Sequence, residues 1–310
     1  MTKFAFLILN YKSTHETEQC VDSIENLEQE ENDVQIIIVD NDSQDGCVEH
    51  FRKIYKGKKY IHIIENENNA GFSRGNNIGY RYAVNVLKAD FICIMNNDTL
   101  IEQNDFFEVI CDEYKKSNYG IMGPKIYLNE GRVNPVYVKL PGVDFFEDLL
   151  KMQKKEYKQM KLHLNYILVP CKLLRNQIYK ILKIERKSRF DGILSLECVN
   201  QRKEDVVLHG CCIVFSPNYC GKYKEGFDPR TFLYKEEELL YLRCKKKNMK
   251  IVYNPKLTIR HLEDVSTNSM KYTRRKKIMF WLKNQIDSLE ILVGELKQEE
   301  KNGIGNNSCL

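Results

Sequence analysis

The chain has 310 residues, of which 43% are hydrophobic and 29% charged, and its net charge is +5 at pH 7. This is the composition of a globular protein and excludes a disordered or collagen-like chain. The eleven cysteines are odd in number and form no C-x-x-C pair. They indicate neither a zinc knuckle nor a complete disulfide framework, and a reducing cytoplasm is the expected location. No apolar run approaches the roughly 18 residues that cross a bilayer, so we expect any membrane contact to be peripheral.

The first hundred residues alternate between strand and helix patterns. Apolar runs predict strands at 4–9, 35–39, 61–65 and 91–95, and periodicity predicts helices at 14–27 and from Gly79 to about Leu87. The run 91–95 has no polar alternation, which is typical of a strand covered on both faces. Strands that alternate with helices indicate βαβ units. The predicted fold is therefore α/β, with a mainly parallel, Rossmann-like sheet and helices on both of its faces.

Polar residues follow two of these strands where each strand ends. Asp40 to Gly46 follows the second strand, and Asn96, Asn97, Asp98 and Thr99 follow the fourth. The carboxyl ends of parallel strands are where open α/β sheets bind ligands, so a carboxylate at 98 is a candidate metal ligand. The alternative is ordinary turn chemistry, in which Asn and Asp bond to their own backbone.

The third strand is followed by a segment rich in Gly and Asn, predicted as a loop from Asn66 to Gly79. Its glycines do not have the G-x-G-x-x-G spacing of a dinucleotide site. Backbone N–H groups and Arg74 in such a loop can still approach a phosphate. The alternative is a plain helix start with Asn76 as the cap.

The next segments change in character. A helix is predicted at 105–116 and a bent strand at 120–127. Residues 145–187 carry apolar residues at helical spacing among many lysines, and Pro170 should divide them into two helices. Basic helices of this kind fit either an anionic membrane surface or a solvated insertion packed on the main domain.

The remaining elements return to the strand and helix pattern. A strand is predicted at 206–215 and a helix at 216–223, and strands at 251–253 and before His261. The helix that begins with Glu236, Glu237 and Glu238 ends in lysines, which suits the helix dipole, but three acids exceed what a cap requires. We expect a basic amphipathic helix at 272–296, containing Trp281, and disorder from Gln298 onward.

Taken in order, these motifs resemble the family 2 inverting glycosyltransferases of GT-A fold, particularly bacterial rhamnosyltransferase-like members that build surface polysaccharides. The resemblance extends from residue 3 to about residue 265. The matching stretches are Ile8–Tyr11, Val39–Ser43, Asn69–Phe72, Gly75–Gly79, Met95–Asp98, Gly123–Lys125, Gly226–Asp228, Phe232–Arg243 and His261.

This resemblance implies roles for individual residues. Asp98, with His261 as a further ligand, would hold Mg²⁺ or Mn²⁺ against the diphosphate of a UDP- or dTDP-sugar. Asp40 and Asp42 would contact the nucleoside. Glu237 falls where the family has its acidic general base, with Glu236 as the other candidate. The implied donor-binding set is Asn10, Tyr11, Asp40, Asp42, Gly71, Arg74, Asn76, Asn77, Asn96 and Asn97.

Two positions depart from the family pattern. Asn96 stands at the first position of the D-x-D motif, so a single carboxylate would anchor the metal and affinity would depend on bound substrate. Leu239 stands where many members keep a second acid. That change leaves the three glutamates competing for the base role, and Glu237 is our prediction.

The chemistry asks for these residue types independently of the resemblance. Displacing a nucleoside diphosphate needs a hard cation with oxygen ligands. The attacking hydroxyl needs a carboxylate to accept its proton. The resemblance, rather than this chemistry, implies the acceptor, which is expected to be a glycan or a polyprenyl-diphosphate-linked sugar at the inner face of the cell membrane. No nucleic-acid motif is apparent.

The predicted organisation has five parts. They are a nucleotide-sugar-binding half (1–130), a basic helical insertion (131–205), an acceptor and catalytic half (206–265), a C-terminal amphipathic helix (266–297) and a disordered tail (298–310). Two other functions stay open from the sequence. They are a sugar nucleotidyltransferase and a non-catalytic protein that binds membrane surfaces through the basic helices.

Overall fold

The computed structural model describes residues 1–28, 32–162, 192–262 and 273–301. The chain divides into two compact units, each made from two stretches of sequence. Unit 1 comprises Met1–Leu140 and Ser195–Met270, and unit 2 comprises Pro141–Leu194 and Lys271–Leu310. The segment 163–191, where Pro170 was expected to separate two basic helices, lies outside the described residues.

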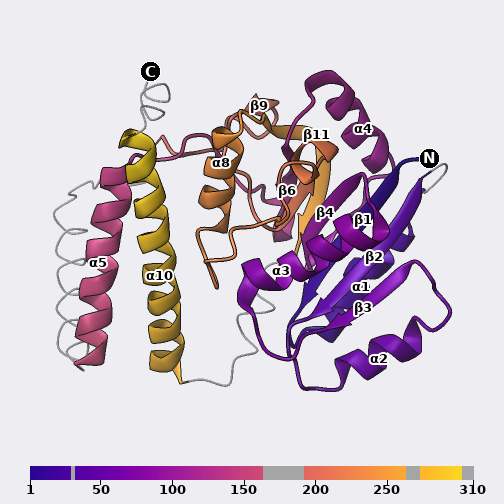
Figure 1. The fold of residues 1–310 in the computed structure, drawn as a ribbon, viewed down its shortest axis with the longest axis horizontal. Helices are drawn as coiled ribbons and strands as arrows, with labels where there is room; N and C mark the ends of the chain where they lie inside the picture. The colour runs from indigo at the N-terminus through magenta and orange to yellow at the C-terminus, as the bar shows by residue number, and fades with distance from the viewer. Residues whose placement is uncertain (29–31, 163–191, 263–272, 302–310) are drawn as a thin grey trace. The chain divides into compact units, whose positions relative to one another are not determined.

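Unit 1 is built on a sheet of nine strands, counted over the described part of the chain (Figure 1). The strand order is β3-β2-β1-β4-β10-β6-β11-β5, and β9 also pairs with β11. The strands are β1 (Lys3–Asn10), β2 (Asp33–Asp40), β3 (Ile61–Glu65), β4 (Phe91–Asn96), β5 (Thr99–Leu100), β6 (Ile121–Tyr127), β9 (Lys203–Glu204), β10 (Cys212–Phe215) and β11 (Ile251–His261). Two short strands outside this sheet are β7 (Val136–Tyr137) and β8 (Leu194–Ser195).

The sheet is mixed but mostly parallel. Strands β3, β2, β1 and β4 run parallel, as do β6 and β11, while β10 runs antiparallel between β4 and β6. The prediction of a mainly parallel α/β sheet is therefore confirmed. The antiparallel strand enters the middle of the sheet from the second stretch of unit 1.

Helices cover both faces of this sheet. Those of unit 1 are α1 (Thr14–Glu25), α2 (Cys47–Ile54), α3 (Gly71–Tyr82), the π-helical turn η1 (Ala83–Leu87), α4 (Phe106–Ser117), the 3₁₀ turn η2 (Asn129–Gly131), α7 (Pro217–Cys220) and α8 (Glu236–Lys246). Side chains alternate along β1, so Phe4, Phe6 and Ile8 join the core cluster beneath α1, α2 and α4. Leu7 and Leu9 point to the other face, where α3 packs.

Two glycines let α3 approach the sheet closely. A Cβ atom at Gly79 would lie 2.4 Å from a side-chain carbon of Leu7, and one at Gly75 would lie 2.8 Å from Leu9. The prediction of a loop as far as Gly79 was therefore wrong, because these glycines are packing positions inside a helix that begins at Gly71. Asn76 lies within this helix and does not cap it.

Three other local predictions need correction. The segment 251–261 is one strand with a register shift between Asn254 and Thr258, rather than two separate pieces. Helix α7 covers only Pro217–Cys220 of the predicted 216–223. Helix α2 was not predicted, since the turn residues that precede it hid its short apolar face of Val48 and Phe51.

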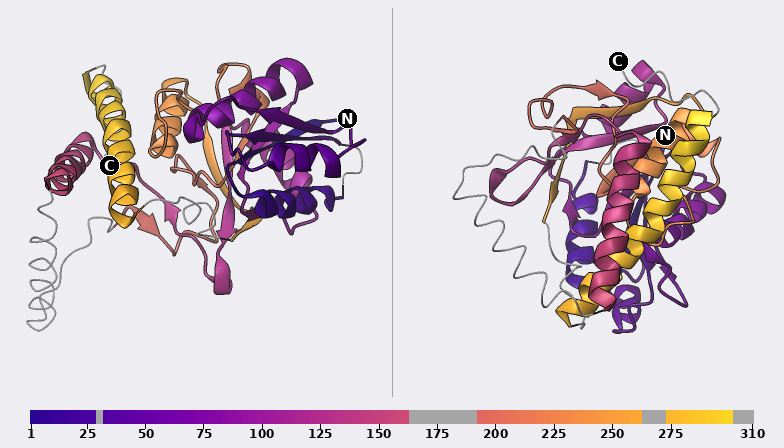
Figure 2. Two further views of the ribbon diagram at one scale, coloured as in Figure 1. Left: turned by 90° about the horizontal axis from the view of Figure 1, so that it is seen from below. Right: turned by 90° about the vertical axis from the view of Figure 1, so that its left-hand side faces the viewer.

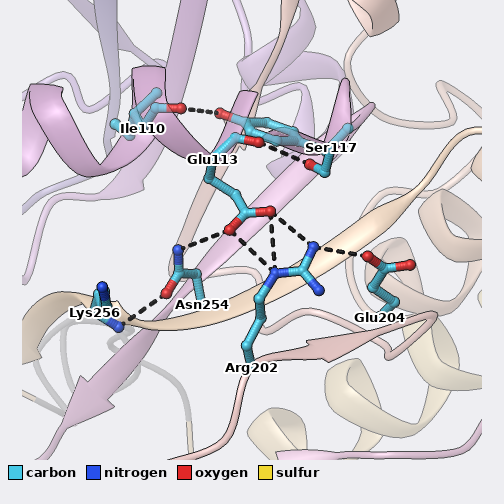
Figure 3. A network of polar contacts seen from close by, with 8 residues as sticks. Ile110, Glu113, Ser117, Arg202, Glu204, Asn254 and Lys256 are labelled. Carbon is cyan, nitrogen blue, oxygen red and sulfur yellow. Dashed lines mark hydrogen bonds and ion pairs between the residues drawn. The ribbon is translucent and has the colours of Figure 1, made fainter. Parts of the chain in front are cut away.

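A partly buried ion pair joins α4 to the end of the sheet that carries β9 (Figure 3). Arg202 donates from Nε and Nη2 to the carboxylate of Glu113 at 2.7 to 3.1 Å, and Asn254 Nδ2 donates to the same carboxylate at 3.2 Å. The Glu113 side chain is 4% exposed. This carboxylate therefore depends on Arg202 for its compensating charge.

Unit 2 contains two antiparallel helices, α5 (Val143–Lys161) and α10 (Arg274–Lys301), which lie side by side (Figures 1 and 2). Lys154 pairs with Glu290 at 2.6 Å, and Lys297 pairs with Glu147. Helix α10 extends to Lys301, so residues 298–301 are helical rather than part of a disordered tail. Among the described residues, no helix has the length and apolar character that crossing a membrane requires.

Candidate active site

The sheet brings Asp98 and His261 together across 163 positions of sequence. Strand β5 pairs antiparallel with the end of β11, which sets His261 opposite Thr99. The N–H of Leu262 donates to the carbonyl oxygen of Asp98 at 2.9 Å. As a result, His261 Nε2 lies 3.2 Å from Asp98 Oδ1, and both side chains are largely buried.

This pair suits a divalent cation. Asp98 Oδ1 is buried and has no hydrogen-bond partner in the described part of the chain, although His261 Nε2 is near it. Two ligands on adjacent corners of an octahedron with bonds of about 2.1 Å are about 3 Å apart, close to the separation seen here. Within the described ranges, no group of three His, Cys, Asp or Glu side chains is arranged to hold a metal. Further ligands from the described residues would have to be polar groups of other types, and the substrate and water can supply more, as is common for Mg²⁺.

The three glutamates at the start of α8 have different surroundings. Glu238 pairs with Lys235 at 2.6 Å and is buried. Glu236 is also buried, its Oε1 has no hydrogen-bond partner among the described residues, and burial raises its pKa to about 8. Glu237 is the least buried of the three, and its Oε1 accepts the N–H of Gly210 at 2.5 Å.

Burial raises the pKa of the Glu237 carboxyl above its usual range. The nearby His209 and the Gly210 N–H both act against this rise, because each favours the ionised carboxylate, whereas Glu238 adds to it. A carboxylate with a raised pKa is a stronger proton acceptor once it is ionised. Burial also raises the pKa of the Glu236 carboxyl, so the pKa does not separate these two glutamates, and Glu237 differs from its neighbours in being the least buried.

Residues 209–211 link the glutamate to the Asp98 region. The carbonyl oxygen of Cys211 accepts the N–H of Asn96 at 2.8 Å and the hydroxyl of Thr99 at 3.4 Å. The ring of His209 lies 5.9 Å from that of His261, measured between centroids. Asp98, from the first half of the chain, and Glu237, from the second half, thus flank one short segment.

Sequence reasoning missed His209 and Gly210. The available signal was a His-Gly pair directly before an apolar strand, which resembles the polar residues that follow β2 and β4. A glycine before a strand has many ordinary explanations, and its contact with Glu237 spans 27 positions.

Asp40 lies in a closed hydrogen-bond network at the end of β2. Its Oδ1 accepts from Asn10 Nδ2 at 2.8 Å and from the Ser43 hydroxyl at 2.5 Å, and its Oδ2 accepts the Ser43 N–H at 3.0 Å. Asn10 and Asp40 are both buried. These contacts hold the loop after β2, and the predicted nucleoside contact stays a prediction.

The neighbouring polar residues divide between internal contacts and exposure. Asn97 is buried and donates to Thr17 Oγ1 at 3.1 Å. Tyr11, Asp42 and Asn96 are each partly exposed, and Asp42 has a positive φ of 65°. The partly exposed residues are those of this group that a donor could reach without rearrangement.

The predicted donor residues of α3 face the segment 227–232. Asn77 donates to the carbonyl of Phe227 and accepts its N–H, at 3.0 and 2.9 Å. Arg74 is exposed and donates to the carbonyl of Pro229 at 2.7 Å. Gly71 has φ +77°, and a Cβ there would lie 2.3 Å from the carbonyl oxygen of Phe232. Asn76 is fully buried, with its Oδ1 unpaired among the described residues.

Comparison with known proteins agrees with this architecture. The family described as Glycosyl transferase family 2 matches residues 6–182, which is more than half of the chain. The chain belongs to this family. The matched region contains Asp98, whereas Glu237 and His261 follow it.

Two named relatives carry similar sequences. The low-salt glycan biosynthesis hexosyltransferase Agl10 of Haloferax volcanii is 28% identical over 127 residues, 41% of this chain and 38% of that protein. Glycosyltransferase GlyG of Streptococcus pneumoniae is 22% identical over 177 residues, 56% of each chain. The similarity thus spans about half, or less, of either relative.

Two solved structures share the fold. Residues 1–349 of TarS from S. aureus, in complex with UDP-GlcNAc, superpose with a TM-score of 0.52 at 12% identity, covering 99% of this chain and 74% of that one. GalNAc-T7 with UDP, GalNAc and Mn²⁺ gives a TM-score of 0.54 at 11% identity, covering 86% and 44%. These similarities confirm the predicted GT-A-like α/β fold.

Proposed function

We propose that this protein is a metal-dependent inverting glycosyltransferase, which transfers a sugar from a UDP- or dTDP-sugar to a hydroxyl group. The observation that carries the proposal is the convergence of Asp98, His261 and Glu237 on residues 209–211, directly before the central strand β10. Membership of Glycosyl transferase family 2 supports the class of reaction. The UDP and UDP-GlcNAc complexes of the two structural neighbours support a nucleotide-sugar donor.

The reaction follows from the residues present. The acceptor oxygen forms a bond to the anomeric carbon while the bond from that carbon to the diphosphate oxygen breaks, and its electron pair leaves with the nucleoside diphosphate. Glu237 receives the hydroxyl proton. Attack from the face opposite the leaving group inverts the anomeric configuration, so no covalent glycosyl-enzyme is needed.

Asp98 and His261 are the residues that would hold Mg²⁺ or Mn²⁺. A cation bound there would supply positive charge next to the departing diphosphate. Asp98 is a single carboxylate, and the uncharged Asn96 stands two residues earlier. We therefore expect the metal and the nucleotide to bind to the protein cooperatively, each increasing the affinity for the other.

The test is release of nucleoside diphosphate from a panel of UDP- and dTDP-hexoses, with Mn²⁺ and with excess chelator. We expect release only with metal, and a loss of about 100-fold or more in Glu237→Gln, because proton transfer to a positioned base contributes about 10²–10⁴-fold. Glu108→Gln, at an exposed position on α4, is the matched control. Unchanged turnover in Glu237→Gln would remove the base assignment, and release of pyrophosphate from a sugar phosphate and a nucleoside triphosphate would indicate a nucleotidyltransferase.

We further propose a glycan or polyprenyl-diphosphate-linked acceptor in surface polysaccharide synthesis, with unit 2 in contact with the inner face of the membrane. Helix α5 supports the membrane contact because it exposes a run of lysines, which are Lys151, Lys154, Lys155, Lys158 and Lys161. Each lysine near an anionic leaflet contributes about 1 kcal/mol. Flotation with phosphatidylglycerol vesicles should fall in the triple variant Lys151→Glu, Lys155→Glu, Lys158→Glu, and equal flotation would indicate a merely structural insertion.

A further inference from the structure

The segment His209–Gly210–Cys211 is closed by its own hydrogen bond. The N–H of Cys211 donates to His209 Nδ1 at 3.1 Å, so the imidazole ring folds back over the backbone. The N–H of Gly210, one residue earlier in the chain, is directed at Glu237 Oε1, 2.5 Å away. The two N–H groups of the turn are therefore committed to two different side chains.

At position 210 the constraint on side-chain size comes from space rather than from backbone conformation. Gly210 is absent from the glycines with positive φ, so other residues could adopt its backbone angles. A Cβ atom at this position would lie 3.2 Å from Oε1 of Glu237 and 3.6 Å from its Cγ. The first distance is tighter than ordinary van der Waals contact, so a side chain here would require the Glu237 carboxylate to shift by a few tenths of an ångström.

The other end of the segment is fixed to the sheet. The Cys211 carbonyl accepts bonds from Asn96 and Thr99, on either side of Asp98. The segment therefore has a defined position relative to Asp98, and it passes this position on to Glu237 through one backbone hydrogen bond.

Resting on the function proposed above, we propose that His209 and Gly210 are positioning residues for the general base. The His209 ring holds the turn, the turn aims the Gly210 N–H at Oε1 of Glu237, and Oε2 is presented to the acceptor hydroxyl. The acceptor proton then passes to Oε2 as the new glycosidic bond forms. Neither residue needs to touch the substrate for this role.

Substitutions of His209 or Gly210 are expected to slow the chemical step rather than to weaken binding of the donor. A base displaced from its productive geometry by a fraction of an ångström accepts the proton less efficiently, and misplacement by 1 Å can cost about 100-fold. Donor binding should change little, because neither residue belongs to the set expected to contact the nucleotide.

The experiment compares variants at these two positions. Asn at 209 can place an amide oxygen where Nδ1 stands and accept the Cys211 N–H, whereas Leu has a similar volume and no acceptor. We expect His209→Leu and Gly210→Ala to lower kcat about tenfold with KM for the donor within about twofold, and His209→Asn to keep at least about half of the wild-type kcat. Gly294→Ala is the matched control, because a Cβ there meets nothing within 4 Å.

Two results would overturn the proposal. One is wild-type kcat in both His209→Leu and Gly210→Ala, and the other is an equal loss in His209→Asn and His209→Leu. If His209→Leu fails to fold, Gly210→Ala alone decides. Unchanged turnover in Glu237→Gln would remove the base assignment and the positioning role with it, whereas an inactive Glu237→Gln beside fully active positioning variants would remove only the positioning role. Failure of the wild-type protein to release nucleoside diphosphate from any donor of the panel would instead overturn the proposed function.

Discussion

The Glu236→Gln variant should become more stable relative to the wild-type protein as the pH rises. Glu236 is 7% exposed, and its Oε1 has no hydrogen-bond partner in the described part of the chain. Burial raises the pKa of this carboxyl from 4.5 to about 8, and the charge of Glu237 adds to the rise. The folded state therefore holds the proton more tightly than the unfolded state does.

The direction of the pH dependence follows from this difference. The stability associated with protonated Glu236 is fully present below about pH 4.5, and it is lost progressively as the pH rises through about 8. At 1.36 kcal/mol per pKa unit, the full shift sets a ceiling of about 5 kcal/mol. Since glutamine stays neutral at every pH, the Glu236→Gln variant does not lose this part of its stability as the pH rises.

The assay is urea unfolding of both proteins at pH 5, 7 and 9. We expect the free energy of unfolding of Glu236→Gln, relative to wild type, to increase by about 2 kcal/mol or more between pH 5 and 9. Glu108→Gln, at its exposed position, should show no such trend. Parallel pH curves for wild type and Glu236→Gln would refute the reasoning, since they would mean that Glu236 ionises as readily in the folded chain as in the unfolded one.

Three further predictions concern other charged groups. Asp98→Asn should weaken the Mn²⁺-dependent binding of UDP by about tenfold or more in calorimetry, because it removes the carboxylate of the proposed metal site; unchanged Mn²⁺ dependence would contradict this. Arg202→Leu should lower the free energy of unfolding, measured in urea, by about 3 kcal/mol, since it leaves the buried Glu113 carboxylate without its charged partner. A decrease of less than about 1 kcal/mol would show that the hydrogen bond from Asn254 is enough to stabilise this carboxylate. Asp40→Asn should lower the free energy of unfolding by about 1–3 kcal/mol, because it disturbs the hydrogen bonds of Asp40 to Asn10 and to the loop after β2. A simultaneous loss of UDP affinity would support the nucleoside contact, whereas intact affinity would leave Asp40 with a structural role only.

Local sequence patterns were sufficient for the parallel half of the fold. Buried apolar runs followed abruptly by polar residues located β2 and β4, together with the positions of Asp40 and Asp98 at their ends. Period and burial are local properties, so a single sequence displays them. The order of the motifs then indicated the family.

The errors arose where one residue type has two physical uses. The glycines of α3 predicted a loop because glycine usually marks turns, whereas here Gly75 and Gly79 admit the side chains of β1 against the helix. The contacts of His209 and Gly210 could not be predicted, because they depend on partners far away in sequence on β11 and α8.

Strand β10 has a consequence for synthesis of the chain. It occupies the place between β4 and β6, yet it is made only after residue 211, when both of its neighbours have already left the ribosome. A nascent chain that ends just before β10 would hold β4 and β6 with open hydrogen-bonding edges, and such edges readily pair with other chains. The N-terminal stretch expressed alone should therefore aggregate, and in the cell it would need shielding until the second stretch arrives.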